Sequence, residues 1–231
     1  MGRPCTYEPK HPSTYAPKHF MRRVFVDPEA PQRDALQEAG KWIVNGGLVA
    51  LPTDTLYGLA VDPFQTDAVA RVLAVKGRQP GHALPLIAAD VDQITASLGP
   101  LPPIGARLAE RFWPGPLTLL LPAPGRLARD VVAGTGRVGV RVPRSDVARA
   151  ICRASRVPIT ATSANVSGQP ATADPDEVER TLGDAVDLLI DAGPAPGGAP
   201  STIVDVTGEA PRLVRAGAIP WDEIQAWLSR S

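Results

Sequence analysis

Two kinds of apolar pattern alternate along this chain. In the first, apolar residues recur every three or four positions, as an amphipathic helix requires; residues 32–45 show this spacing, and Gly46-Gly47 ends it. In the second, apolar residues follow one another without interruption, as in Leu48–Leu51, which is typical of a strand covered on both faces. The alternation predicts a single α/β domain in which helices pack on a twisted, mostly parallel or mixed sheet.

The later segments repeat both patterns. Further helices are predicted at residues 66–75, 90–98, 104–112, 146–155 and 220–228. Another helix starts at Asp174, which can cap it, with Pro175 suited to its first turn. Strands are predicted at residues 84–88, 117–121, 138–142, 157–161, 188–190, 202–206 and 212–214. The segment Gly193–Pro200 is rich in Gly, Pro and Ala, and we interpret it as a flap or a crossover rather than a domain boundary.

The composition restricts the functional classes. Apolar residues make up 44% of the 231 residues and aromatic residues only 5%, so the expected core consists of Ala, Val, Leu and Ile. The 24 basic and 24 acidic side chains cancel, which argues against a general nucleic-acid or membrane-surface binder but allows a local basic pocket. Two cysteines are too few for a disulfide framework or a zinc site, and no apolar run approaches the ~20 residues of a membrane span. We therefore expect a cytoplasmic protein.

The N-terminal segment differs from the rest of the chain. Residues 1–20 contain four prolines and few apolar side chains, so residues 1–22 are interpreted as a flexible extension that catalysis does not need. The folded domain is expected at residues 28–230. A start codon at Met21 and a specific binding arm are the alternative interpretations.

Two short polar segments carry the first candidate chemistry. Lys76-Gly77-Arg78 ends a predicted helix, and Ser163-Ala164-Asn165 follows an apolar strand. Two cations beside small polar groups would bind a polyanion, most simply a nucleotide. In that interpretation, loss of either cation would stop the chemistry and barely affect folding. The alternative is that the cations only interact with the helix dipole, with Gly77 ending the helix.

A third polar segment directly follows a predicted buried strand. Thr53 and Thr55 offer hydroxyl groups, Asp54 a carboxylate, and Tyr57 a flat ring with a polar tip. Such a position suits ligand binding, although a turn with an Asx-type cap is an equally good interpretation. Arg141 lies inside an apolar strand, where a charge needs a partner or a wet cavity.

Taken together and in order, these motifs resemble the Sua5/YrdC/YciO family of threonylcarbamoyl-AMP synthases. The matching segments are residues 46–59, 76–78, 84–86, 113–118, 138–143, 157–165, 201–204 and 215–217. The resemblance covers about residues 30–230 and corresponds to the short form of the family, without the C-terminal domain of its longer members. It implies a YrdC-like fold with a concave, positively charged cavity.

The resemblance also implies three groups of site residues. L-Threonine would contact Thr55, Arg141, Ala161 and Ser201, with Arg141 near its carboxylate. The nucleotide would contact Arg78, Arg137, Ser163 and Arg215. Lys76 and Arg78 would be catalytic, and Thr53, Tyr57 and Asn165 would line the rest of the site.

The implied reaction joins L-threonine, bicarbonate and ATP into threonylcarbamoyl-AMP and releases pyrophosphate. A separate tRNA threonylcarbamoyltransferase complex would then pass the group to adenosine 37 of tRNAs. Mg²⁺ is expected on the ATP phosphates and not in a protein metal site. Because the substrate's own carbamate oxygen attacks phosphorus, the protein needs no nucleophile and mainly positions anions.

Some positions depart from the family pattern. Gln79 precedes Pro80, Leu84 stands where Asn is frequent, and Ala88-Ala89 stand where some members have a His, for which His82 is a candidate replacement. Two alternatives therefore stay open. One is a related enzyme that forms a carbamoyl-adenylate, and the other is a non-enzymatic module of the same fold that binds tRNA or double-stranded RNA weakly.

Overall fold

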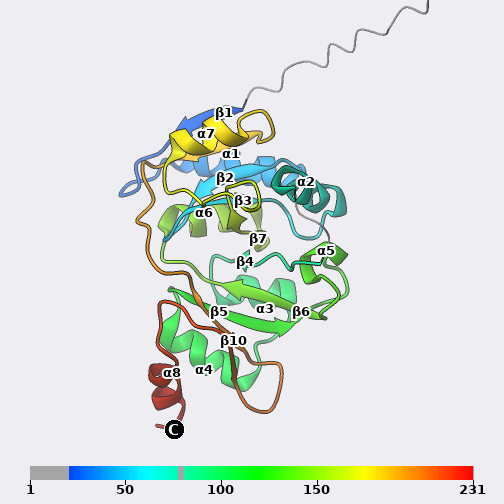
Figure 1. Ribbon diagram of the computed structural model, residues 1–231, viewed down its shortest axis with the longest axis vertical. Helices are drawn as coiled ribbons and strands as arrows, with labels where there is room; N and C mark the ends of the chain where they lie inside the picture. The colour runs from blue at the N-terminus through cyan, green and yellow to red at the C-terminus, as the bar shows by residue number, and fades with distance from the viewer. Residues whose placement is uncertain (1–20, 78–80, 231) are drawn as a thin grey trace, which may run out of the picture.

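The computed structural model describes residues 21–77 and 81–230 as a mixed α/β domain with two sheets, stacked along the long axis of the molecule (Figure 1). The five-stranded sheet has, in spatial order, β1 (Arg22–Phe25), β9 (Leu188–Asp191), β2 (Val49–Pro52), β3 (Tyr57–Ala60) and β8 (Thr162–Ser163). The six-stranded sheet has the order β11 (Arg212–Arg215), β10 (Thr202–Asp205), β5 (Leu117–Pro122), β6 (Arg137–Arg141), β4 (Leu86–Ile87) and β7 (Ile159–Thr160). Both sheets contain parallel and antiparallel pairs.

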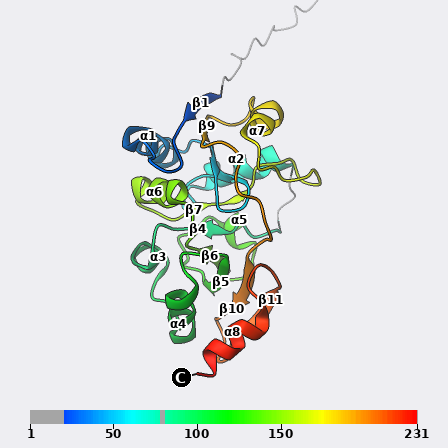
Figure 2. The same cartoon turned by 90° about the vertical axis from the view of Figure 1, so that its left-hand side faces the viewer.

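The helices lie on the outside of the two sheets. Four of them form a column along one side of the molecule in Figure 2: α1 (Arg33–Val44), α6 (Asp146–Ser155), α3 (Val91–Leu98) and α4 (Pro103–Phe112). The others are α2 (Thr66–Lys76), α5 (Arg129–Val132), α7 (Pro175–Leu182) and α8 (Trp221–Leu228). Helices α1 and α6 pack closely because Gly40 has no side chain; a Cβ there would lie 2.6 Å from Cβ of Ala154.

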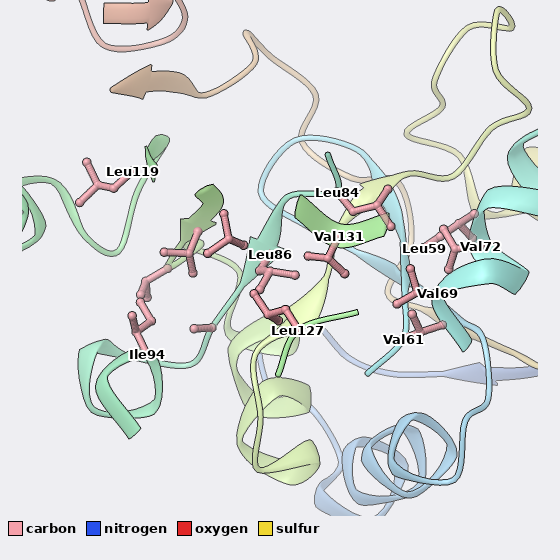
Figure 3. Close-up of a cluster of buried hydrophobic side chains, with 14 of the residues drawn as sticks. Leu59, Val61, Val69, Val72, Leu84, Leu86, Ile94, Leu119, Leu127 and Val131 are labelled. Atoms are coloured by element: carbon pink, nitrogen blue, oxygen red, sulfur yellow. The ribbon is translucent and has the colours of Figure 1, made fainter. Parts of the chain in front are cut away.

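The main hydrophobic core runs through both sheets. Figure 3 shows Leu59 from β3, Val69 and Val72 from α2, and Leu86 from β4 in one buried cluster. A second cluster lies between α1, α6 and the opposite face of β2. Strand β2 is therefore buried on both faces, with Ala50 in the first cluster and Leu51 in the second, as its uninterrupted apolar run predicts.

The predicted elements are confirmed, with changes at their boundaries and in how the strands pair. The expected single sheet is divided in two, and the chain passes from β7 to β8, between the sheets, at Ala161. The segment Gly193–Pro200 links β9 to β10 and is a crossover between the sheets. Strands β1, β3 and β8 and the short helix α5 were not predicted. Because β1 pairs in parallel with β9, the ordered domain begins before residue 28. Residues 1–20 of the predicted extension lie outside the described residues, and its last residue, Arg22, begins β1.

Within residues 21–77 and 81–230, every helix is too short or too polar to cross a bilayer.

Candidate active site

A cavity of about 680 Å³ lies over one face of the six-stranded sheet. Alternate residues of the central strands reach it: Thr118 and Leu120 of β5, and Gly139 and Arg141 of β6. The residues between them, such as Val140, point into the core, as the two-residue period of a strand requires. Further lining residues come from the turn before β3, the loop before β4, strand β8 and the region around β10 and β11: Thr55, His82, Ala161, Ser163, Ser201 and Arg215. Both sheets therefore contribute to the walls.

Arg141 brings a positive charge to the floor of this cavity. Its Nη1 donates to Oδ1 of Asp54 at 2.7 Å, and each side chain keeps only about a tenth of its surface exposed, at 11% and 12%. The second oxygen of Asp54 accepts the backbone N–H of Arg144 at 3.2 Å. The charge inside the apolar strand thus has both the partner and the cavity that it requires.

Arg215 is the second cation of the cavity. Its Nη2 donates to the carbonyl oxygen of Ser201 at 2.7 Å and lies 3.3 Å from the hydroxyl oxygen of that residue. Burial, followed by the nearby charge of Arg141, lowers the pKa of Arg215. Within residues 21–77 and 81–230 no carboxylate forms a salt bridge with Arg215, so its charge is available to an anionic ligand.

The turn between β2 and β3 places Thr55 in the cavity wall. The hydroxyl of Thr53 donates to the carbonyl oxygen of Leu56 at 2.8 Å and accepts the backbone N–H of Thr55 at 3.2 Å. The carbonyl oxygen of Thr55 accepts the N–H of Gly197, in the crossover, at 2.7 Å. Thr53 is therefore buried inside the turn and supports Thr55, while Thr55 faces the cavity. The hydroxyl of Thr53 thus stabilises a turn, and ligand binding by Thr55 stays a prediction.

The structure brings together the two polar segments that lie far apart in the sequence. Lys76 Nζ lies 2.5 Å from the carbonyl oxygen of Ser163, 3.0 Å from that of Asn165 and 2.9 Å from Oδ1 of Asn165. Its side chain is almost fully buried, with 1% exposed. Lys76 therefore holds the turn after β8 through oxygen acceptors, and these buried contacts argue against the expectation that its loss would barely affect folding. The alternative of a surface cation at a helix end is wrong, although Gly77 does end α2, with φ 59°.

The hydroxyl of Ser163 belongs to the same network. It donates to Oδ1 of Asn165 at 2.5 Å, and the amide nitrogen of Asn165 donates to the carbonyl oxygen of Gln169 at 2.5 Å. Ser163 lines the cavity, whereas Asn165 lines a separate hollow together with residues of α7. Asn165 thus holds the hydroxyl of Ser163 without lining the cavity itself. Arg78 lies outside the described residues.

Tyr57 does not line the cavity, contrary to expectation. It begins β3 and is completely buried, with its hydroxyl donating to the carbonyl oxygen of Gly193 at 2.7 Å and accepting the N–H of Ala192 at 3.3 Å. Burial raises the pKa of this hydroxyl. The register of β3 against its two neighbours, β2 and β8, turns the ring into the core.

Arg137 also lies outside the set of cavity-lining residues. It is on β6, four positions before Arg141, and forms an ion pair with Asp205 of β10. Asp205 further accepts hydrogen bonds from Arg212 and Thr207. Burial opposes the charge of this carboxylate, but the hydrogen bonds from Thr207, Arg212 and Arg137 outweigh it and lower its pKa to about 2. The predicted contact between Arg137 and the nucleotide stays a prediction.

Three residues of the site were missed in the sequence: Asp54 as the partner of Arg141, Thr118 and Gly139. A polar residue and a glycine inside otherwise apolar strands are signals of a site where a ligand approaches the backbone. In Leu117–Leu121 and Val138–Val142 these signals are Thr118 and Gly139, and both lie on the cavity floor. A Cβ at Gly139 would come within 3.3 Å of side-chain carbons of Thr118 and Leu120. Glycine therefore leaves room for these two side chains on the cavity floor.

Comparison with known proteins identifies relatives over most of the chain. The threonylcarbamoyl-AMP synthase of Bacillus subtilis is 37% identical over 201 residues, which are 87% of this chain and 56% of the relative. The crystal structure of Pyrococcus abyssi Sua5 complexed with L-threonine superposes with a TM-score of 0.83 at 34% identity, covering 89% of this chain and 60% of that one. Escherichia coli YciO superposes with a TM-score of 0.77 at 26% identity and is covered to 97%.

The chain spans only somewhat more than half the length of the first two of these proteins. The sequence model of the Sua5/YciO/YrdC family, described as "Telomere recombination", matches residues 41–217, and this range contains the cavity-lining residues named above. The family model covers most of the chain, and the relatives are similar over most of its length, so the chain belongs to the Sua5/YciO/YrdC family.

Proposed function

We propose that this protein is an L-threonylcarbamoyladenylate synthase, a nucleotidyltransferase that makes threonylcarbamoyl-AMP and pyrophosphate from L-threonine, bicarbonate and ATP. The observation that carries the proposal is the cavity, in which Thr55, Arg141 and Ser201 come together from three distant parts of the chain. The relatives named threonylcarbamoyl-AMP synthase and the relative solved with L-threonine support the same function.

The proposed amino-acid subsite has the groups that an amino acid requires. The guanidinium of Arg141 is suited to a carboxylate, because its planar fork matches two oxygens. Asp54 holds one edge of that guanidinium and so fixes its orientation before the substrate arrives. The hydroxyl groups of Thr55 and Ser201 would satisfy the remaining polar groups of threonine, and Ala161 would form part of the wall.

The proposed nucleotide subsite lies on the side of Arg215 and Ser163. Arg215 carries a charge without a salt-bridged carboxylate among the described residues, and Ser163 presents a hydroxyl that the Lys76 network holds in place. With Arg78, these groups would bind the phosphates. The catalytic role of Lys76 would then be indirect in part, since its ammonium orders the turn that carries Ser163.

The chemistry that follows uses the substrates' own groups. The amine of threonine and bicarbonate form a carbamate, losing water, and a carbamate oxygen attacks the α-phosphorus of ATP. The bond from that phosphorus to the bridging oxygen breaks, and pyrophosphate leaves with the electron pair. The protein contributes positioning and positive charge, which stabilises the oxygens of the phosphorus in the transition state.

Mg²⁺ would enter with ATP as part of the substrate. The carboxylate of Asp54 contacts the cavity residue Arg141. Both of its oxygens already accept hydrogen bonds, one from Arg141 and the other from the N–H of Arg144. Among residues 21–77 and 81–230, no three His, Cys, Asp or Glu side chains gather as metal ligands. Phosphate oxygens and water would therefore hold the ion, as Mg²⁺ prefers. The product is a reactive mixed anhydride, which a tRNA threonylcarbamoyltransferase complex would consume.

The test is threonine-dependent release of pyrophosphate from MgATP in bicarbonate buffer, with identification of threonylcarbamoyl-AMP by mass spectrometry. We expect no release when threonine or bicarbonate is omitted, and at least a hundredfold loss in Arg141→Met, which removes the cation but keeps a long side chain. Equal release with and without threonine would contradict the proposal. Release that depends instead on carbamoyl phosphate would identify the carbamoyl-adenylate enzyme that the sequence left open.

A further inference from the structure

Two hydroxyl groups form a pair on the cavity floor. The hydroxyl oxygens of Thr118, on β5, and Ser201, just before β10, lie 2.8 Å apart. Thr118 has only 4% of its surface exposed, yet both residues line the cavity. A hydrogen bond between two side chains that face a ligand cavity is a candidate for holding one of them in a functional orientation.

The two hydroxyl groups carry two protons, and the hydrogen bonds among the described residues use only one of them. Arg215 can only donate, so its Nη2 approaches the Ser201 hydroxyl as a donor, at 3.3 Å. One of the two hydroxyl protons makes the bond between Thr118 and Ser201. The other has no acceptor in the contacts of the described residues, so the pair offers one O–H donor to a ligand in the cavity.

The sheet register places this donor beside the proposed amino-acid subsite. Strand β5 pairs with β6 in antiparallel register, with Leu119 opposite Val140 and Leu120 opposite Gly139. One position further along, Thr118 lies opposite Arg141, and directly opposed side chains on one face are neighbours about 5 Å apart at Cβ. On its other side Thr118 pairs with Ile203 of β10. The hydroxyl pair therefore lies next to the guanidinium proposed to hold the carboxylate.

We propose that Thr118 is a positioning residue that holds the Ser201 hydroxyl so that the pair donates one hydrogen bond to an acceptor oxygen of the amino-acid substrate. This inference rests on the proposed function. It assigns to Thr118 a role in amino-acid binding, separate from the binding of ATP.

The variant that tests this is Thr118→Val, which keeps the shape of the side chain and removes the hydroxyl. We expect the KM for threonine to rise roughly tenfold, because the Ser201 hydroxyl loses its partner, while kcat and the KM for ATP stay within about twofold. Thr118→Ser retains the hydroxyl and should bring the threonine KM back to within about threefold of the native value. Calorimetric titration with threonine provides a second readout that needs no turnover.

A matched control is Thr160→Val. Thr160 is also a fully buried strand threonine, and its hydroxyl accepts the N–H of Val61 at 3.0 Å, but it does not line the cavity. This variant should lower the unfolding midpoint and leave the threonine KM unchanged. In a Ser201→Ala background, Thr118→Val should produce no further rise in the threonine KM, because it acts through Ser201. If Thr118→Val lowers the unfolding midpoint, all titrations with threonine are run below the midpoint of the least stable variant, so that every comparison is made on folded protein.

The outcomes separate the two proposals. If the native protein shows neither threonine-dependent turnover nor threonine binding, both proposals are overturned. If the native protein is active and Thr118→Val keeps the native threonine KM, the positioning role is wrong and the proposed function stands. If Thr118→Val raises the KM for ATP instead, the donor serves the nucleotide, which also overturns the inference.

Discussion

The carboxylate of Asp54 reaches Arg141 from the other sheet: Oδ1 lies 2.7 Å from Nη1, with Asp54 in the turn between β2 and β3 and Arg141 at the end of β6. Both side chains are nearly buried. The pair therefore links the two sheets at the cavity, and it connects Thr55, the neighbour of Asp54, to the strand that carries Arg141.

Asp54→Ala should weaken both the fold and the amino-acid subsite. Removal of one partner leaves the Arg141 charge uncompensated, which in a buried pair costs about 3–5 kcal/mol and less where cavity water reaches it. We expect a loss of at least ~1 kcal/mol in the free energy of unfolding measured with urea, together with a raised threonine KM. Glu38→Ala, which removes the ion pair between a half-buried carboxylate and the exposed Arg22, is the control and should cost less than about 1 kcal/mol.

Lys76→Met should destabilise the protein by about 2–4 kcal/mol. Methionine keeps the length of the buried stem, but the oxygens of Ser163 and Asn165 lose the donor that they share. Urea unfolding and activity should therefore decline together. An unfolding curve like that of the native protein would contradict a structural role for this ammonium.

Arg78→Lys tests the second cation of the same segment. If Arg78 binds a phosphate through its planar fork, lysine keeps the charge and loses the bidentate contact. The expected result is a kcat lower by about 10²–10³, the usual effect of losing one electrostatic donor at a reacting centre, with a melting temperature close to the native one. Native turnover in this variant would exclude Arg78 from the chemistry.

Tyr57→Phe tests whether the Tyr57 hydroxyl contributes to stability alone or also to activity. The variant loses the hydrogen bonds to Gly193 and Ala192 and should lower the free energy of unfolding by about 1–2 kcal/mol. Because the ring does not line the cavity, kcat and both KM values should remain native. A selective rise in one KM would show that the hydroxyl acts on the site through the crossover that begins at Gly193.

Ionisation of Asp205 makes part of the free energy of unfolding depend on pH. Its pKa is lowered to about 2 in the folded protein, below the usual value of 3.8, so its contribution is complete above about pH 4 and is lost as the pH falls toward 2. We expect this contribution to be on the order of 1–2 kcal/mol. Asp205→Asn should therefore be less stable than the native protein at pH 6, and the difference should shrink at pH 2.5. A difference that is constant with pH would contradict the assignment.

The sequence predicted the elements well because local rules decide them. The Asp174 side chain accepts the N–H of Asp176 at the start of α7, as its position before a proline predicts. The need of Arg141 for a partner or a cavity followed from its apolar neighbours, and the structure contains both. These inferences use only residues close together in the chain, where composition and spacing determine the local structure.

Contacts between distant segments could not be predicted in the same way. The burial of Lys76 depends on oxygens of Ser163 and Asn165, and local sequence describes only a helix that ends in a cation. The direction of Tyr57 depends on the register of β3 against β2, and a shift of one residue would turn it to the other face. The division into two sheets likewise depends on which strands pair, which the apolar pattern does not specify.

The walls of the cavity come from both sheets, so a ligand bound there affects the stability of the protein and its resistance to proteolysis. A molecule that filled the cavity would contact Thr55 on one side and the β5–β6 floor on the other, and would therefore hold the two sheets together. Any ligand that binds only the native state adds to its stability by mass action, about 2.7 kcal/mol at a concentration one hundred times its Kd. A steady supply of such a ligand would therefore slow the degradation of the protein by proteases.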